Sequence, residues 1–452
     1  MSTSIVNALP GRYRVALAER YPLVSDAVEG VIERVAPVAT ALPAPVAVAE
    51  GESVNISELI ESEGVIEETA IPTLAPTFTP QPTATVTIVE EIVAEPTEFV
   101  VEPTLEPTSI PTPTIEPTPE LPPRPSNVRL EGLQGIQQTF NNCGPANLTQ
   151  VMNFHGSDIN QADVATYLKP NPEDRNVSPW QIADYVNEQT FGQYRAIARS
   201  GGNMEMLKQF IAAGLPVVVE KGYFPNTANA QGWWGHYLTI FGYDDELEEF
   251  YAMDSFLGPF NDVGSVETYA DIELFWQHFN YTFYVVYQPA EEEVVFQILG
   301  NEMLNDFDMW RNAAAIAEQE TRDDPDNAFA WFNVGTSLTR LGELTGEPQY
   351  YQGGAQAFDR AREIGLPPRM LWYQFRPYFA YLKTARYQDM LDLANATLET
   401  QGGRNVEETY WHKGHALLGL QDVAGAAEAY REALRANANF YPAQISLNAI
   451  GG

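Results

Sequence analysis

The sequence predicts an α+β domain over residues 127–289, followed by an all-α region of helical repeats over residues 290–452. In the first region, segments with helical spacing of apolar residues precede most segments with strand patterns. This order is typical of an α+β fold with a mostly antiparallel sheet. In the second region the helical pattern continues to the end of the chain, and tryptophan recurs about every 40 residues. A length of 452 residues suits two or three domains.

The residues before the α+β domain have a different composition. The segment 1–35 is mixed, and its part 25–35 is compatible with a helix. The segment 36–126 has Arg124 as its only basic residue and is dominated by Glu, Pro, Thr and Val. Proline removes hydrogen-bond donors and like charges repel, so we predict a disordered, extended linker over 36–126. The alternative is a ligand for a proline-binding domain.

A stalk of this composition favours an extracellular or cell-surface location, because a stalk is useful only when its far end is tethered. A standard signal peptide is not recognisable, since the basic residues near the start are followed by no clean apolar core. A cytoplasmic location, or a missing or misassigned gene start, is the alternative.

Composition excludes several classes of function. With 61 acidic and 25 basic residues the net charge is −36, which argues against nucleic acid and against an anionic membrane surface as partners. No apolar run of 18 residues occurs, so we expect no membrane-spanning helix. A single cysteine excludes an intramolecular disulfide and a cysteine-based zinc site.

Within 127–289 the pattern predicts helices and strands at definite places. The expected helices follow Cys143 as far as Gly156 and then cover Asn160–Leu168, Ser178–Phe191 and Asn203–Ala213. Ser178 followed by proline is a helix-start signal. The expected strands are Gln193–Ala198, Pro216–Lys221, His236–Tyr243, Glu249–Met253 and Thr282–Gln288.

The only cysteine, Cys143, stands at the start of the first of these helices. Unpaired N–H groups and the positive end of the helix dipole favour the thiolate there, which is the nucleophilic form. Gln137 and Gln138, just upstream, are candidate donors to a developing oxyanion. The competing interpretation is that Cys143 is a small buried hydrophobic residue.

A base and a carboxylate follow the cysteine in the chain. His236 opens a strand, and Asp254 ends the next one. The order Cys, His, Asp fits a nucleophile, a base and a carboxylate that orients the base. We prefer Asp254 to Asp244 and Asp245, because the latter pair is expected to shape the turn after the strand. The other histidines, none of which has a partner at metal-ligand spacing, are interpreted as structural: His155, His278, His412 and His415.

These motifs resemble the papain-like cysteine peptidases related to the bacteriocin-processing, double-glycine leader peptidases. The matching residues are Gln-x-x-x-x-Cys-Gly-Pro-Ala from Gln138, Gly-His-Tyr from Gly235, Gly-Tyr-Asp-Asp from Gly242, and Met-Asp-Ser around Asp254. The resemblance covers about residues 130–289. It implies a papain-like fold, with Cys143 as nucleophile, His236 as base and Asp254 as orienting carboxylate, and no cofactor or metal.

The resemblance leaves two candidates for the oxyanion donor. Leader-peptidase relatives place a glutamine six residues before the cysteine, which is Gln137 here. Relatives with Asn-Asn-Cys-Gly-Pro place it five residues before, which is Gln138, and we prefer Gln138. Trp233 and Trp234, before His236, are expected either to wall a substrate cleft or to anchor a surface loop.

The residues after 289 carry an internal repeat. Trp331, Trp372 and Trp411 mark its period, and the helices over 354–361 and 425–433 match each other in small and aromatic residues. This resembles tetratricopeptide (TPR) repeats, about three of them. The resemblance implies binding of a protein partner. The acidic run Asp323–Asp326 is interpreted as a cap for the helix that follows.

Three hypotheses for function follow. The first is a cysteine peptidase for a peptide or protein substrate, with repeats that hold a partner or substrate close to Cys143. The second keeps the fold but replaces hydrolysis with acyl transfer, or with peptide binding alone. The third is a scaffold whose repeats do the biological work.

Overall fold

The computed structural model describes residues 41–46, 54–61, 123–224, 232–400 and 402–452. All of these belong to one compact unit. The possible helix over 25–35 lies outside the described residues, and so does most of the predicted linker.

The described residues contain a sheet of seven strands, all paired antiparallel, with the order β2-β7-β3-β4-β5-β6. The seventh strand, β1, pairs with the end of β4 beyond the part that β3 covers. Their bounds are β1 Asn127–Arg129, β2 Arg195–Arg199, β3 Val217–Tyr223, β4 Trp234–Asp244, β5 Glu249–Asp254, β6 Ser265–Thr268 and β7 Phe283–Tyr287. The predicted α+β domain with an antiparallel sheet is confirmed. The prediction missed β1 and β6, because three or four residues are too few to carry a pattern.

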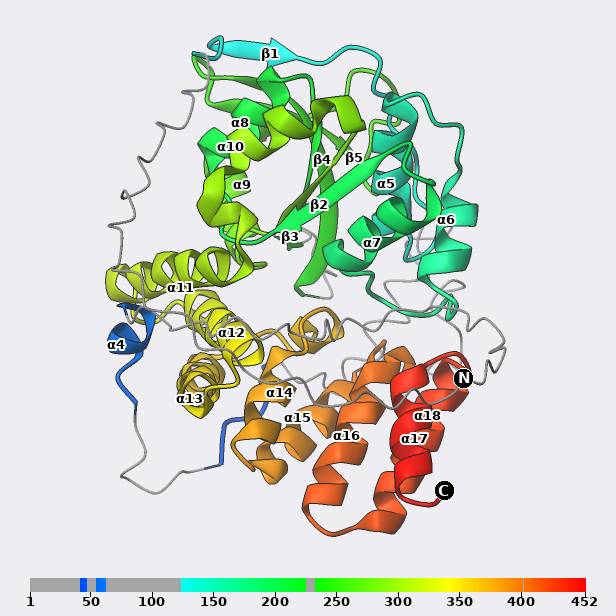
Figure 1. Cartoon of the computed structure of the whole chain (residues 1–452), viewed down its shortest axis with the longest axis vertical. Helices are drawn as coiled ribbons and strands as arrows, with labels where there is room; N and C mark the ends of the chain where they lie inside the picture. Colours follow the sequence, from blue (N-terminus) through cyan, green and yellow to red (C-terminus); the bar gives the residue numbers. More distant parts are fainter. Residues whose placement is uncertain (1–40, 47–53, 62–122, 225–231, 401) are drawn as a thin grey trace, which may run out of the picture. The chain divides into compact units, whose positions relative to one another are not determined.

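Helices lie on both sides of this sheet (Figure 1). One side carries α5 Cys143–Phe154, α6 Gln161–Leu168 and α7 Pro179–Gln189, and the other carries α8 Met204–Ala212, α9 Tyr269–Gln277 and α10 Glu292–Leu304. Along β3, Val218 packs with the first set while Val217 and Val219 pack with the second. This alternation follows from the period of two along a strand.

The helix-start signals act as the sequence predicts. Ser178 accepts a hydrogen bond from the Gln181 N–H, and the Gln181 side chain bonds back to the Ser178 N–H, which completes a capping box. Asn160 and Asn203 cap α6 and α8 through their side chains. These caps fix where each helix begins, and thereby the loops that connect the helices to the sheet.

After residue 289 the described secondary structure consists of helices joined by short loops. The α-helices are α11 Asp306–Asp323, α12 Ala328–Thr345, α13 Pro348–Ile364, α14 Arg376–Lys383, α15 Tyr387–Glu399, α16 Glu407–Gly419, α17 Val423–Ala436 and α18 Tyr441–Ala449. Three short 3₁₀ turns are interspersed: η1 Pro289–Glu291, η2 Met370–Trp372 and η3 Gly403–Asn405. Each α-helix packs on the next in sequence, so the predicted all-α region is confirmed.

Small residues and aromatic rings pack together in two of the predicted repeats. A Cβ atom at Gly335 on α12 would overlap the ring of Phe358 on α13, and one at Gly414 on α16 would overlap the ring of Tyr430 on α17. Phe358 and Tyr430 occupy the same place in the match between the second helices, whereas the glycines stand four residues after Trp331 and three residues after Trp411. The predicted repeat position of Trp372 is wrong, however, because this residue lies in η2 after the helix-breaking prolines 367 and 368.

The acidic run before α12 has a different role from the predicted one. Asn327 caps this helix, accepting from the N–H groups of Phe329 and Ala330. Asp326 instead pairs with Arg360 at 2.9 Å. An amide side chain one residue later therefore replaces the predicted aspartate cap.

Two short segments within the predicted linker are packed against the helical region. The helix α4, Ile56–Glu61, lies against α11 and α13 and buries Ile60. Residues 41–46 contact the end of α13, where the Leu42 N–H donates to the Leu366 carbonyl at 2.9 Å. The prediction of a disordered linker is therefore wrong for 41–46 and 54–61. Average composition does not reveal a few apolar residues that fit sites elsewhere in the chain.

The sheet and the helical region share a hydrophobic core. One cluster joins Trp276 and Phe283, from the sheet domain, to Ala313 on α11 and Leu338 on α12. Hydrogen bonds cross the same boundary, for example from Asn333 Nδ2 to the Gln277 carbonyl at 2.7 Å. The helices after 289 therefore form part of the support of the sheet.

Candidate active site

The loop before Cys143 is held in a specific conformation. Asn141 has a φ of 57°, in the left-handed region that asparagine tolerates better than most residues. The Lys169 ammonium donates to the Asn141 carbonyl at 2.6 Å, and Arg175 donates to its side-chain oxygen at 2.9 Å. The helix α5 begins directly afterwards, and the Asn142 side chain makes no capping hydrogen bond. The thiol of Cys143 thus lies at an uncapped helix N-terminus.

The β4–β5 hairpin brings His236 and Asp254 together. Leu238 is paired with Asp254 across the two strands, so His236 lies on the same face one pair further along. His236 Nε2 and Asp254 Oδ1 are 3.0 Å apart. The backbone N–H groups of Phe256 and Leu257 also donate to Asp254 Oδ1, at 2.7 and 2.9 Å. These donors orient the carboxylate toward the imidazole.

Cys143 and His236 line the same pocket, and each affects the pKa of the other. Because His236 Nε2 is engaged with Asp254, Nδ1 is the ring nitrogen left for the thiol. Burial raises the pKa of the Cys143 thiol, but the hydrogen bond and charge of His236, together with the Lys169 charge, outweigh it and lower the pKa. The structure therefore favours a thiolate beside an imidazolium.

The pKa values of His236 and Asp254 shift in opposite directions. Burial lowers the pKa of His236, but the charge and hydrogen bond of Asp254 and the contact with Cys143 raise it to about 10. Burial raises the pKa of Asp254, while His236 and the two backbone donors bring it down to about 2. Each shift favours the charged form, which is the pattern of a mutually stabilised ion pair.

The two candidate glutamines lie in different surroundings. Gln138 is half-buried, its Oε1 accepts from Ser255 Oγ at 2.8 Å, and its backbone N–H donates to the Ser255 carbonyl at 2.8 Å. Gln137 has an exposed side chain, and its carbonyl accepts from Gln161 at 2.8 Å. Because Ser255 binds the amide oxygen of Gln138, the NH₂ group is the end that remains to act on a substrate.

A buried asparagine, which the sequence did not single out, connects these elements. Asn147 is fully buried and donates from Nδ2 to the Cys143 carbonyl at 2.9 Å, the Tyr237 carbonyl at 3.1 Å and Ser255 Oγ at 3.1 Å. Its Oδ1 accepts from Thr239 at 2.7 Å. The available signal was a polar residue one helical turn after the cysteine, on the side of α5 that meets the sheet.

A narrow pocket opens beside the thiol, with free space of about 10 Å³, room for roughly one water molecule. Three contributors to its wall were not predicted. Glu220 projects from β3, and burial raises its pKa well above the usual range. Arg175 comes from the loop before α7, and Tyr373 comes from the helical region. The complete lining is Asn141, Cys143, Gly144, Arg175, Asn176, Val177, Glu220, Gly235, His236, Tyr237 and Tyr373.

The sequence held a signal for one of these residues. Glu220 follows three valines in a strand. A carboxyl group buried in such a strand is costly unless it is hydrogen-bonded or its pKa is shifted, so it is a candidate site residue. Tyr373 carried no such signal, since it is distant in sequence from every motif. It is placed by tertiary contacts, including the bond from Asn176 Nδ2 to its carbonyl at 3.0 Å.

The two tryptophans do not line the pocket beside the thiol. Trp233 is buried, donates from Nε1 to His278 Nδ1 at 3.0 Å and meets the rings of Phe329 and Tyr373. The ring of Trp234 lies under the Arg369 guanidinium, 4.0 Å from the ring centroid, and meets the edge of Trp372. Both residues thus attach the start of β4 to the helical region.

The remaining candidates lie away from the thiol. Asp244 accepts from the N–H groups of Glu246 and Leu247, as a turn residue does, and Asp245 pairs with Lys208 at 3.0 Å. The four histidines other than His236 do not line the pocket. Within the described parts of the chain, His, Cys, Asp and Glu form no group of three that could hold a metal ion.

The comparison with protein families matches residues 131–283 to the Peptidase_C39 like family. The chain therefore contains a Peptidase_C39 like domain. This family match suggests a cysteine peptidase, and it covers the whole set of Cys143, His236, Asp254 and Gln138. A helical region follows the domain. A comparison with curated proteins finds no match.

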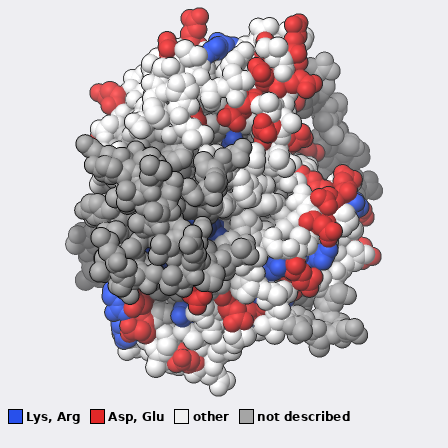
Figure 2. Space-filling view, turned by 180° about the vertical axis from the view of Figure 1, so that it is seen from behind, with Lys and Arg blue, Asp and Glu red and all other residues white. Residues whose placement is uncertain are grey.

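The surface around this domain is acidic. Red patches of Asp and Glu are spread over the face shown in Figure 2, and blue patches of Lys and Arg are fewer. A surface of this charge does not suit a phosphate backbone. Among the helices that the structure describes, none has both the length and the apolar character needed to cross a membrane.

Proposed function

We propose that the protein is a cysteine peptidase that hydrolyses peptide bonds through Cys143, His236 and Asp254. The observation that carries the proposal is that Cys143, at a helix N-terminus, lines one pocket with His236, whose Nε2 lies 3.0 Å from Asp254 Oδ1. This is the arrangement of nucleophile, base and orienting group that acyl transfer to a thiol requires.

The reaction proceeds in two steps. The Cys143 thiolate attacks the scissile carbonyl carbon, and the Gln138 NH₂ group and the Cys143 backbone N–H stabilise the oxyanion. The His236 imidazolium gives its proton to the leaving amine, and a thioester to Cys143 remains. Water then attacks the thioester while His236 takes a proton from it, which releases the carboxylic acid and restores the thiolate. Asp254 holds the imidazole so that Nδ1 faces the sulfur throughout.

The helical region is proposed to hold a protein substrate or partner in the manner of TPR repeats. The similar glycine-to-ring contacts, Gly335–Phe358 and Gly414–Tyr430, support a repeated two-helix unit. Arrays of such units offer surfaces for extended peptide segments. The region also contributes Tyr373 to the pocket wall, so a segment held there lies close to the reactive thiol.

Labelling of the full chain with a fluorescent iodoacetamide tests the nucleophile, because Cys143 is the only possible thiol. We expect fast labelling at pH 6, at least tenfold slower labelling in His236→Ala, and none in Cys143→Ser. His278→Ala is a poor control because it breaks a buried hydrogen bond, whereas His155→Ala alters a histidine outside the pocket and should label as wild type. Equal labelling of wild type and His236→Ala would contradict the proposed ion pair.

Product analysis separates hydrolysis from the alternatives. A mixture of peptides is incubated with the protein in water enriched in ¹⁸O, and the products are examined by mass spectrometry. We expect new C-termini that carry ¹⁸O and that are absent with Cys143→Ser. Products joined to an added amine without ¹⁸O would indicate acyl transfer, and the absence of any product despite labelling would favour a peptide-binding role.

A further inference from the structure

The segment 41–46, Ala-Leu-Pro-Ala-Pro-Val, is bound to the helical region through its backbone. The N–H groups of Leu42 and Val46 donate to the Leu366 carbonyl and to Asp389 Oδ1, both at 2.9 Å. The Pro43 and Ala44 carbonyls accept from Arg362 Nε and Nη2, at 2.8 and 2.9 Å. Hydrogen bonds to the main chain thus run along most of this segment.

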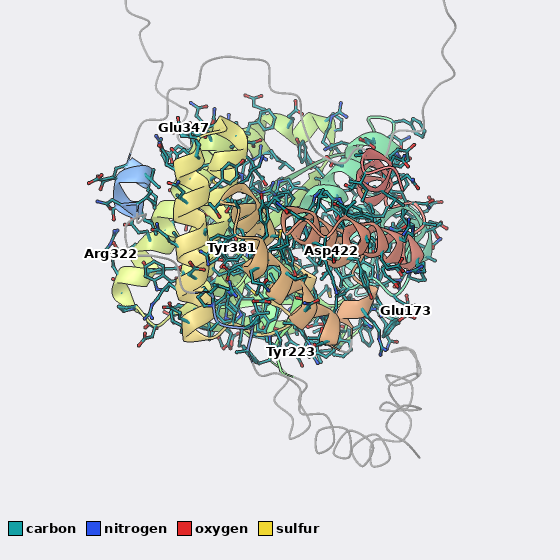
Figure 3. The ribbon with its side chains drawn as sticks, turned by 90° about the horizontal axis from the view of Figure 1, so that it is seen from below. Glu173, Tyr223, Arg322, Glu347, Tyr381 and Asp422 are labelled. Carbon is teal, nitrogen blue, oxygen red and sulfur yellow. The ribbon has the colours of Figure 1, made fainter. Side chains whose placement is uncertain are left out.

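The groups that bind the segment are themselves buried and fixed. Arg362 on α13 and Asp389 on α15 are each 3% exposed, and Arg362 Nη1 lies 2.8 Å from Asp389 Oδ1. Arg362 Nη1 also donates to the Tyr381 hydroxyl at 2.9 Å, and Figure 3 labels Tyr381 on α14. A buried guanidinium is costly unless its N–H groups are paired. The carbonyls of the segment accept from two of the five N–H groups of Arg362. Without a peptide main chain in this place, those two groups would lose their partners.

One side chain of the segment packs in an apolar cluster of the helical region. Leu42 is 4% exposed and belongs to the same buried cluster as Phe332, Phe358, Leu366 and Leu393. The prolines at 43 and 45 have no N–H, and the site takes N–H groups only from positions 42 and 46. Prolines also favour an extended chain before binding, which reduces the entropy lost on docking.

We propose that this groove between α13 and α15 is a recognition site for extended Leu-Pro-x-Pro segments, and that residues 41–46 occupy it in cis. A segment of the same chemistry from another protein binds there when the chain's own segment is displaced. The site is separate from the thiol pocket, with which it shares no lining residue. The inference therefore goes beyond the proposed peptidase activity and does not rest on it.

The chain's own segment has an advantage over an external peptide. The helix α4, only a short distance further along the chain, is anchored by the buried Ile60 and by a hydrogen bond from Ser57 to Glu318. A tethered segment acts at an effective concentration in the millimolar range. We therefore expect an external peptide to bind the wild-type chain weakly, and to bind strongly once the internal segment is disabled.

The test uses the full chain and a fluorescein-labelled peptide with the sequence of residues 40–47, Thr-Ala-Leu-Pro-Ala-Pro-Val-Ala. The variant Leu42→Asp places a charge in the apolar cluster and releases the internal segment. Fluorescence anisotropy should show at least tenfold tighter binding of the peptide to Leu42→Asp than to wild type. A control peptide with Asp in place of its leucine should bind neither protein.

A second pair of variants tests the groove itself. In the Leu42→Asp background, Arg362→Lys loses the planar fork that serves two carbonyls and should weaken binding at least tenfold. Arg360→Lys, on the same helix but partly exposed and paired with Asp326, is the matched control and should bind as its parent does. Near-ultraviolet circular dichroism checks that the variants are folded.

Two results would overturn the proposal. One is equal affinity of the labelled peptide for wild type and Leu42→Asp. The other is equal affinity of the leucine peptide and its aspartate control for the Leu42→Asp protein. This second comparison leaves Arg362 unchanged, so it tests the proposal even if the Arg362→Lys variant does not fold.

Discussion

Cys143 is subject to two opposing effects, burial and the charges around it. Burial alone makes a thiol less acidic, and Cys143 lies at the base of a narrow pocket. His236 and Lys169 reverse this effect because both present positive charge to the sulfur. The reactivity of this thiol therefore depends on the partners of His236 as much as on the helix that begins at Cys143.

This balance predicts the pH dependence of alkylation. The pKa of Cys143 is lowered, so the iodoacetamide rate should rise with pH in a step below the reference value of about 8.5. His236→Ala should move the step to higher pH, because burial raises the pKa of the Cys143 thiol and His236 no longer lowers it. Peptide cleavage should also fall as pH rises through about 10, where His236 loses the proton that it gives to the leaving amine.

The measurement is the rate of single-site alkylation between pH 5 and 10, followed by mass spectrometry. A wild-type step at or above 8.5 would contradict the ion pair between Cys143 and His236. Denatured protein provides the reference curve for the same thiol without its environment.

At the scale of elements, α5 and the β4–β5 hairpin are joined by a buried polar network. Asn147 on α5 bonds to the backbone of β4 and to Ser255, which directly follows β5. Ser255 in turn bonds to Gln138. Ser255, which does not itself line the pocket, therefore connects Gln138, the proposed oxyanion donor, to the helix that begins at Cys143.

We expect Ser255→Ala to lower kcat about tenfold or more while leaving KM nearly unchanged. Loss of the Ser255 hydroxyl lets the Gln138 amide rotate, which weakens its hydrogen bond to the transition state. A tenfold fall in kcat corresponds to about 1.4 kcal/mol of lost transition-state stabilisation. Cleavage kinetics of a peptide substrate provide the measurement. Ser265→Ala, which removes a half-buried hydroxyl on β6, is the matched control.

Labelling of Cys143 separates this effect from general damage. The thiol should alkylate at the wild-type rate in Ser255→Ala, because the His236 and Asp254 contacts are intact. A parallel loss of labelling and cleavage would mean that Ser255 supports the fold rather than the position of Gln138.

At the scale of the whole molecule, the helical region forms part of the wall of the pocket beside Cys143. Tyr373 lines the pocket, and its ring contacts Trp233 and Phe279 from the sheet domain. A Cβ atom at Gly235 would lie 2.9 Å from the Tyr373 ring, so the backbone beside His236 packs directly on it. The sequence-based hypothesis gave the repeats a role in recruitment, with a platform packed on the α+β domain as its alternative, and it did not foresee a pocket residue from this region.

Shortening the chain to residues 127–289 should therefore weaken cleavage of short peptides as well as of proteins. Recruitment alone would leave short peptides unaffected. Tyr373→Ala in the full chain isolates the local contribution: we expect a wider pocket and a shift of cleavage toward substrates with bulkier side chains near the scissile bond. Tyr373→Phe keeps the ring and should retain the wild-type preference, measured with a peptide library and mass spectrometry. An unchanged preference in Tyr373→Ala would exclude a role in selectivity.

Much of the local structure could be predicted from the sequence. Ser178, Asn160 and Asn203 begin helices where the pattern expects them, since caps act over three or four residues. Cys143, His236 and Asp254 stood out because each occupies the end of a predicted element, and element ends present side chains to a common site. The roles of these residues remain proposals, but their proximity follows from one helix and one hairpin.

Only the tertiary structure revealed Tyr373, Asn147 and the docking of residues 41–46. The contacts of Tyr373 and of residues 41–46 follow no period of 2 or 3.6 residues, so no local pattern reports them, and the helical spacing of Asn147 from Cys143 does not reveal its partners on β4 and beyond β5. Pro43 and Arg362 meet across more than 300 positions of sequence, and the apolar cluster around Leu42 exists only once α12, α13 and α15 have packed together. The sequence alone determined which elements form and which chemistry they carry, whereas the packing of distant elements decided which residues complete each site.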